Sequence, residues 1–214
     1  MPAHPAGGGG IEPAQTATRA QGHSLKVCDC YRPARAGEDF AAWVRDPHDQ
    51  TMKGEFYPDE DKSKLFADGY VGSGMTSHSG GTAMDLTLVP LPEPTQRAYV
   101  PGEPLVSYSA PAAQRFPDNS VDMGTGYDCF DARSHTMDSR ITRSARDNRL
   151  LLRRLMTDAG FVTTPTSGGT MTSPTSPVRA STSTSPSPAP RSGDRPSTRH
   201  TRAVPYLVVA RLAS

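Results

Sequence analysis

The amino-acid sequence predicts an α+β fold, in which a small antiparallel sheet is flanked by helices. Two segments, 24–31 and 83–90, are typical of strands, and the second alternates apolar and polar side chains. Two others, 38–45 and 144–160, carry apolar side chains at helical spacing. Strands and helices do not alternate strictly along the chain, which favours α+β over a doubly wound parallel sheet.

Turn-forming residues separate these elements. Arg32-Pro33 ends the first strand, since proline lacks the amide hydrogen that a sheet ladder needs. Residues 46–64 are polar and rich in turn formers, and residues 91–120 contain many prolines, so we expect both to be irregular. The helix at 144–160 has a leucine stripe with arginines on its other face, and Gly160 is placed to end it.

Composition divides the 214 residues into three zones. Residues 1–15 are mostly Ala, Pro and Gly, and we expect them to be disordered. Residues 16–162 contain the predicted elements and form one domain. Residues 163–214 are a low-complexity Ser/Thr/Pro tail, in which 163–200 has too little apolar surface to offset the entropy cost of ordering.

Charge and hydropathy narrow the classes of function. The formal net charge is +1, so nothing points to nucleic acid or an anionic membrane as a partner. No apolar run is long enough for a transmembrane helix. The first residues lack the basic start and apolar core of a signal peptide, and we therefore expect a cytoplasmic location. The sequence carries no signal for an oligomeric state.

The segment 77–89, SHSGGTAMDLTLV, holds two potential metal ligands. His78 and Asp85 are seven positions apart, an odd spacing that would put them on opposite faces of one straight strand. Gly80-Gly81 interrupts the strand, so the chain can fold back and let both side chains converge. Imidazole and carboxylate are good zinc ligands, but a catalytic zinc usually has three protein ligands. Taken alone, a histidine in such a loop is more often simply exposed.

Five stretches together resemble, in order, the zinc D-alanyl-D-alanine dipeptidases of the VanX type. They are VCDCYRPARA (27–36), FYPDEDKSKLFADGYVGSG (56–74), SHSGGTAMDLTLV (77–89), GYDCFDARSH (126–135) and NRLLLRRLMTDAGF (148–161). The resemblance implies a hydrolase with one zinc ion per chain that cleaves the free dipeptide D-Ala-D-Ala. This dipeptide is a cell-wall precursor, so the resemblance also implies a link to glycopeptide resistance or dipeptide salvage.

The resemblance also implies roles for individual residues. His78 and Asp85 would be two of the three zinc ligands. Arg32 would stabilise the oxyanion of the tetrahedral intermediate, which suits a guanidinium with its permanent charge and fixed donors. Asp128 would hold the ammonium group of the dipeptide, and Ser77 would donate a hydrogen bond near the ligand. Loop capping is the alternative for the last two residues.

The family's third zinc ligand and its general base come from a Glu-x-x-His unit that should follow Phe161. After Phe161 the chain has no glutamate, and its one histidine is His200. Codons that can encode residues 166–171, ACG-AGT-GGT-GGC-ACT-ATG, contain GAG-TGG-TGG-CAC-TAT in a shifted frame, which reads Glu-Trp-Trp-His-Tyr. We therefore predict a shift of the reading frame between about Phe161 and Thr164, and an out-of-frame tail.

The chain as printed lacks this base and third ligand, so we expect weak zinc binding and hydrolysis reduced by orders of magnitude. We also expect a fold that is incomplete at both ends and a polypeptide that is insoluble or inactive. Two alternatives stay open. The chain is a degraded, non-catalytic relative, or it is a zinc D,D-carboxypeptidase that acts on peptidoglycan peptides.

Overall fold

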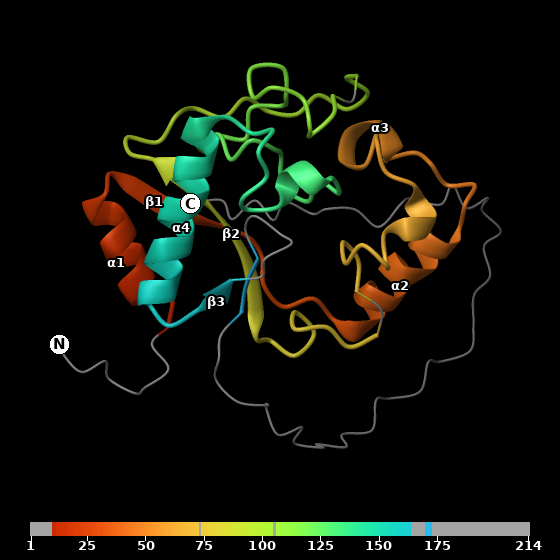
Figure 1. Ribbon diagram of the computed structural model, residues 1–214, viewed down its shortest axis with the longest axis horizontal. Coiled ribbons are helices and arrows are strands. Elements are labelled where there is room, and N and C mark those ends of the chain that lie inside the picture. Colours follow the sequence, from red (N-terminus) through yellow and green to blue (C-terminus); the bar gives the residue numbers. More distant parts are fainter. Residues whose placement is uncertain (1–9, 73, 105, 164–169, 173–214) are drawn as a thin grey trace, which may run out of the picture. The chain divides into compact units, whose positions relative to one another are not determined.

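The computed structural model describes residues 10–72, 74–104, 106–163 and 170–172, all within one compact unit of the chain. Its helices and strands confirm the α+β class (Figure 1). In chain order they are α1 (Glu12–Ala20), β1 (His23–Asp29), α2 (Ala34–Arg45), α3 (Lys53–Phe56), β2 (Ala83–Pro90), α4 (Arg143–Asp158), β3 (Val162–Thr163) and β4 (Thr170–Thr172), with short 3-10 helices at Lys62–Lys64 and Ala132–Ser134.

The strands form one antiparallel sheet in the order β1-β2-β4-β3. A bulge between Val27 and Asp29 adds a residue to β1 and brings Asp29 opposite Asp85 of β2. On the other edge of β2, Asp85 stands opposite Thr170 of β4. Asp85 therefore has a strand neighbour on each side.

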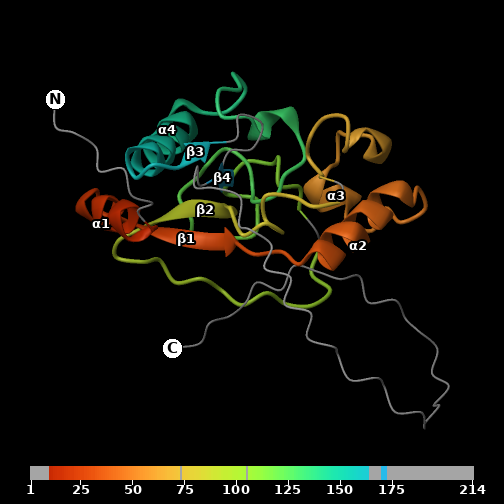
Figure 2. The ribbon, with the colours of Figure 1, turned by 90° about the horizontal axis from the view of Figure 1, so that it is seen from below.

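One apolar core lies between the sheet and two helices. Helices α1 and α4 contact each other and the sheet (Figure 2). The core consists of Ala14, Leu86, Leu88, Leu152, Met156 and Phe161. Leu86 and Leu88 alternate with Asp85 along β2, so the core and the Asp85 carboxylate lie on opposite faces of the strand.

A second core joins α2, α3 and the segment before α4. Its buried members are Val44, Phe56, Tyr57, Leu65, Val71 and Phe130. Aromatic rings dominate it, and the rings of Phe40 and Trp43 stack with centroids 5.4 Å apart at its margin. Phe130 donates its backbone N–H to the carbonyl of Phe56 at 2.8 Å, which ties the segment to α3.

The N-terminal region corrects one expectation. Residues 12–15 lie in α1 and are not disordered, while residues 1–9 are outside the described part of the chain. Ala14 is only 1% exposed, and the Thr18 hydroxyl, fully buried, donates to the Ala14 carbonyl at 2.6 Å. Small side chains allow the helix to approach the sheet closely, so a segment of low hydropathy contributes to the core.

Three further differences concern element boundaries. Helix α2 begins at Ala34, just after Pro33, and not at residue 38. Within 46–64, where we expected a loop, the chain forms α3 and a 3-10 turn. Thr163 and residues 170–172 of the expected low-complexity tail lie in strands, while 164–169 and 173–214 are outside the described residues.

Among the helices that are described, none is long and apolar enough to cross a membrane.

Candidate metal centre

Three residues from separate segments bring potential ligand atoms together. Asp29 ends β1, His78 lies in the turn before β2, and Asp85 lies within β2; their ligand atoms are all within 4.8 Å of one another. The distance from His78 Nε2 to Asp85 Oδ1 is 3.6 Å. Gly81, at φ +68°, donates its N–H to the His78 carbonyl, so the Gly-Gly turn folds the chain back as the sequence predicts.

The hydrogen bond of His78 fixes which ring nitrogen faces Asp85. His78 Nδ1 lies 2.9 Å from the carbonyl oxygen of Cys30. A carbonyl only accepts hydrogen bonds, so Nδ1 carries a proton and donates it. In the neutral imidazole Nε2 then carries a lone pair, which faces Asp85 Oδ1. A backbone carbonyl on one ring nitrogen is the usual way in which a metal-binding histidine is oriented.

The two oxygens of the Asp85 carboxylate have different surroundings. Asp85 is only 4% exposed. Its Oδ2 accepts a hydrogen bond of 2.9 Å from the Tyr127 hydroxyl. Its Oδ1 is buried and, among the described residues, has no hydrogen-bond partner. A buried acceptor is costly without a partner. A cation shared by Oδ1 and the His78 lone pair satisfies both atoms, so this donor set fits a metal ion.

Arg32 is held by Asp29 at the edge of this cluster. Asp29 Oδ2 accepts hydrogen bonds from Arg32 Nε at 3.0 Å and Nη2 at 2.5 Å, and Asp29 Oδ1 accepts the Cys30 N–H at 2.7 Å. Burial lowers the pKa of Arg32, but the hydrogen bonds and charge of Asp29 outweigh this and raise it overall. The guanidinium therefore remains a fixed positive charge.

All five residues singled out from the sequence line one pocket of about 300 Å³, namely Arg32, Ser77, His78, Asp85 and Asp128. Asp128 adopts φ +54°, a left-handed conformation that is uncommon outside glycine. Burial raises the pKa of Asp128 to about 7, the charge of Asp85 acts in the same direction, and Arg32 opposes both. Ser77 is exposed at the pocket, and its carbonyl accepts the Thr82 N–H.

Two residues of the centre were missed by the sequence reasoning. Asp29 precedes Arg32 by three positions, a spacing that offers an ion pair, but its place opposite Asp85 depends on the bulge in β1. Tyr127 adjoins Asp128 in the stretch GYDCFDARSH, and its contact with Asp85 spans 42 positions of sequence. Nothing in the sequence signals that contact.

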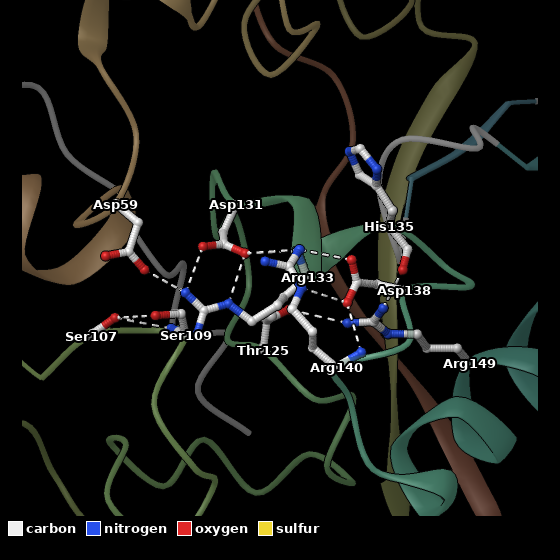
Figure 3. A network of polar contacts seen from close by, with 10 residues as sticks. All are labelled: Asp59, Ser107, Ser109, Thr125, Asp131, Arg133, His135, Asp138, Arg140 and Arg149. Atoms are coloured by element: carbon white, nitrogen blue, oxygen red, sulfur yellow. Dashed lines mark hydrogen bonds and ion pairs between the residues drawn. The ribbon is translucent and has the colours of Figure 1, made fainter.

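Figure 3 shows a network of arginine contacts to residues that precede and follow, in the chain, the segment that carries Tyr127 and Asp128. Arg149 of α4 donates to the carbonyls of Met123 and His135, each at 2.6 Å, on the two sides of that segment. Further along, Arg133 binds Asp131 through Nε at 2.8 Å and Nη2 at 2.7 Å and also pairs with Asp59, while Arg140 pairs with Asp138.

Comparison with known proteins points to one group. Residues 117–167 match the family model described as D-Ala-D-Ala dipeptidase. The chain is similar to the D-alanyl-D-alanine dipeptidases of Enterococcus faecalis (32% identity over 71% of this chain), Enterococcus faecium (33% over 66%) and Streptomyces coelicolor (30% over 69%). The matched regions span 62%, 57% and 61% of the lengths of these relatives.

Proposed function

We propose, because the chain belongs to the D-Ala-D-Ala dipeptidase family of hydrolases, that its gene encodes a zinc-dependent enzyme that cleaves D-Ala-D-Ala. The observation that carries this proposal is the pair formed by His78 Nε2 and the buried, otherwise unpartnered Asp85 Oδ1, 3.6 Å apart. Two such acceptors facing each other are best explained as ligands of one cation.

The other residues of the pocket take the roles that their chemistry suits. Bound zinc supplies a Lewis acid and lowers the pKa of water toward about 7. Arg32, held by Asp29, stabilises negative charge that develops on the scissile carbonyl oxygen. Asp128 pairs with the ammonium group of the dipeptide, and Ser77 is a hydrogen-bond donor to an oxygen of the ligand. Removal of this dipeptide depletes a cell-wall precursor, which gives the enzyme a role in glycopeptide resistance or dipeptide salvage.

We further propose that the missing general base and third ligand lie in a shifted reading frame. The shifted Glu-Trp-Trp-His falls on codons 166–170; residues 166–169 are outside the described part of the chain, and the histidine codon ends within Thr170. The sheet register supports the proposal, since position 170 stands opposite Asp85. Directly opposed positions in an antiparallel pair share a face of the sheet, so a histidine there would stand beside the Asp85 carboxylate.

The first test is the DNA sequence across codons 155–180. We expect a base gained or lost there, and a frame that reads Glu-Trp-Trp-His. An intact printed frame would contradict the frame proposal and leave a degraded, non-catalytic relative.

The second test compares hydrolysis by the 214-residue chain and by the frame-restored chain. We expect the restored chain to hydrolyse D-Ala-D-Ala in the presence of zinc and to reject peptides extended at the amino end, and the printed chain to be inactive. His78→Ala in the restored chain should lower kcat/KM by about 10³-fold or more, since it removes a zinc ligand. Preference for the extended peptides would indicate a D,D-carboxypeptidase, and a soluble printed chain with equal activity would refute the need for the shifted frame.

A further inference from the structure

The Asp85 carboxylate has one oxygen engaged and one oxygen presented. Oδ2 accepts the Tyr127 hydroxyl at 2.9 Å, whereas Oδ1 faces His78 Nε2. A carboxylate attached through a single bond can rotate and exchange its two oxygens. The hydrogen bond from Tyr127 fixes the plane of the carboxylate, because any partial rotation would take the accepting oxygen away from the hydroxyl, whereas a half-turn only exchanges two equivalent oxygens.

The position of Tyr127 is itself fixed by its neighbours in the chain. The N–H of Gly126 donates to the Tyr108 carbonyl at 2.8 Å, and a Cβ at Gly126 would come within 2.4 Å of the Tyr108 ring. On the other side, Asp128 adopts φ +54°. The Tyr127 hydroxyl is the donor in its contact with Asp85, because a carboxylate oxygen only accepts hydrogen bonds.

We propose that Tyr127 is a positioning residue of the metal centre, whose hydroxyl orients the Asp85 carboxylate so that Oδ1 alone is presented to the cation. This inference rests on the proposed function, since it assumes that His78 and Asp85 hold a metal ion. Hydrogen bonds to metal-binding carboxylates commonly change metal affinity by about 10–100-fold. Tyr127, which was not predicted from the sequence, would donate such a hydrogen bond to Asp85.

The test is the affinity for zinc of the Tyr127→Phe variant, which keeps the ring and removes the hydroxyl. Affinity is measured by competition with a chromophoric chelator, in the full 214-residue chain and in parallel in the frame-restored chain. We expect binding about 10–100-fold weaker than in the unsubstituted protein. Tyr108→Phe is the matched control, because Tyr108 is also partly buried and its hydroxyl bonds a carboxylate, that of Glu55. That variant should bind zinc as the unsubstituted protein does.

A spectroscopic measurement separates positioning from a purely structural role. With cobalt in place of zinc, Tyr127→Phe should weaken the visible absorption, because a freed Oδ2 can also coordinate and raise the coordination number above four. The free energy of unfolding of the metal-free variant serves as the stability control.

The outcomes distinguish this inference from the proposed function. If Tyr127→Phe matches the unsubstituted protein in zinc affinity and cobalt spectrum, the inference is overturned while the dipeptidase proposal stands. If neither chain binds zinc, or if Asp85→Asn binds it undiminished, the metal centre itself is refuted and the inference falls with it.

Discussion

At the scale of single residues, Asp29 and Asp85 face each other across β1 and β2 but serve different partners. Asp85 is buried and presents an oxygen to His78, whereas Asp29 is partly exposed and binds the Arg32 guanidinium. The charge of Arg32 also offsets the repulsion between the two carboxylates. In the proposed function, one acid would therefore serve the metal ion and the other would orient the arginine that acts on the substrate.

Asp29→Asn tests this division of roles. The amide keeps the size of the side chain but removes the charge that orients Arg32, so we expect kcat of the frame-restored enzyme to fall about 10–100-fold with KM much less affected. Steady-state kinetics with D-Ala-D-Ala provides the measurement. Asp39→Asn, at an exposed position of α2, is the control and should be neutral. If Asp29→Asn lowered the affinity for zinc by as much as it lowered kcat, Asp29 would instead be a metal ligand.

The sequence could predict part of this site. The Gly-Gly turn between His78 and Asp85 implied that both side chains converge, and they do. The bulge that brings Asp29 opposite Asp85 has no local signature in Val27-Cys28-Asp29, since none of these residues requires an unusual backbone conformation. Tyr127 was missed for another reason, because a contact across 42 positions depends on the whole fold.

At the scale of elements, α4 links the sheet to the segment that carries Tyr127 and Asp128. The leucine stripe and the helix itself were predicted from the sequence, with the arginines on the opposite face. Arg149 corrects that expectation, because it is only 1% exposed and donates to backbone carbonyls. Spacing along a helix indicates which face a residue occupies. Whether another segment covers the polar face, as it does at Arg149, cannot be predicted from that spacing.

Arg149→Met should destabilise the protein by about 2–4 kcal/mol, because it leaves the buried carbonyls of Met123 and His135 without their donor. Chemical denaturation measures the change in the free energy of unfolding. Arg153→Met on the same helix is exposed and should change stability by less than about 0.5 kcal/mol. Equal effects of the two substitutions would show that Arg149 stabilises the fold only through helix propensity.

At the scale of the whole molecule, two cores and one charge network hold the described part of the chain together. The α+β class followed from short segments whose apolar patterns are local. The second core could not be predicted from the sequence. Helix α3 has four residues and the 3-10 helix at Lys62–Lys64 has three, which is too short for an apolar pattern to show. Both are stabilised by packing around Phe56 and Leu65. The pairing of β4 with β2 could not be predicted either, since the three residues Thr-Met-Thr do not specify a strand partner or a register.

The charge network makes stability depend on pH. Burial would raise the pKa of Asp131, but hydrogen bonds and charge from Arg133 outweigh it and lower the pKa below its usual value. The stabilisation by Asp131 is therefore complete above the unfolded pKa of about 3.9 and is lost as the pH falls through the folded pKa. We expect Asp131→Asn to lower the free energy of unfolding by about 2 kcal/mol at pH 7. This gap between the two proteins should close as the pH falls below about 4.

Urea unfolding of the two proteins from pH 7 to pH 2.5 measures this gap. Asp147→Asn is the control, since Asp147 is exposed on α4 and its substitution should have little effect at any pH. A gap that stays constant across the range would mean that the Asp131 charge does not stabilise the fold.

The position of Asp85 between β1 and β4 has a consequence for how this protein tolerates changes of length. Its alignment with Asp29 and Thr170 depends on the register of two strand pairs. Insertion or deletion of one residue in either flanking strand would turn its following side chains to the other face of the sheet. Natural variation in length should therefore accumulate in the irregular segment 91–120, while the strands around Asp85 vary by substitution alone.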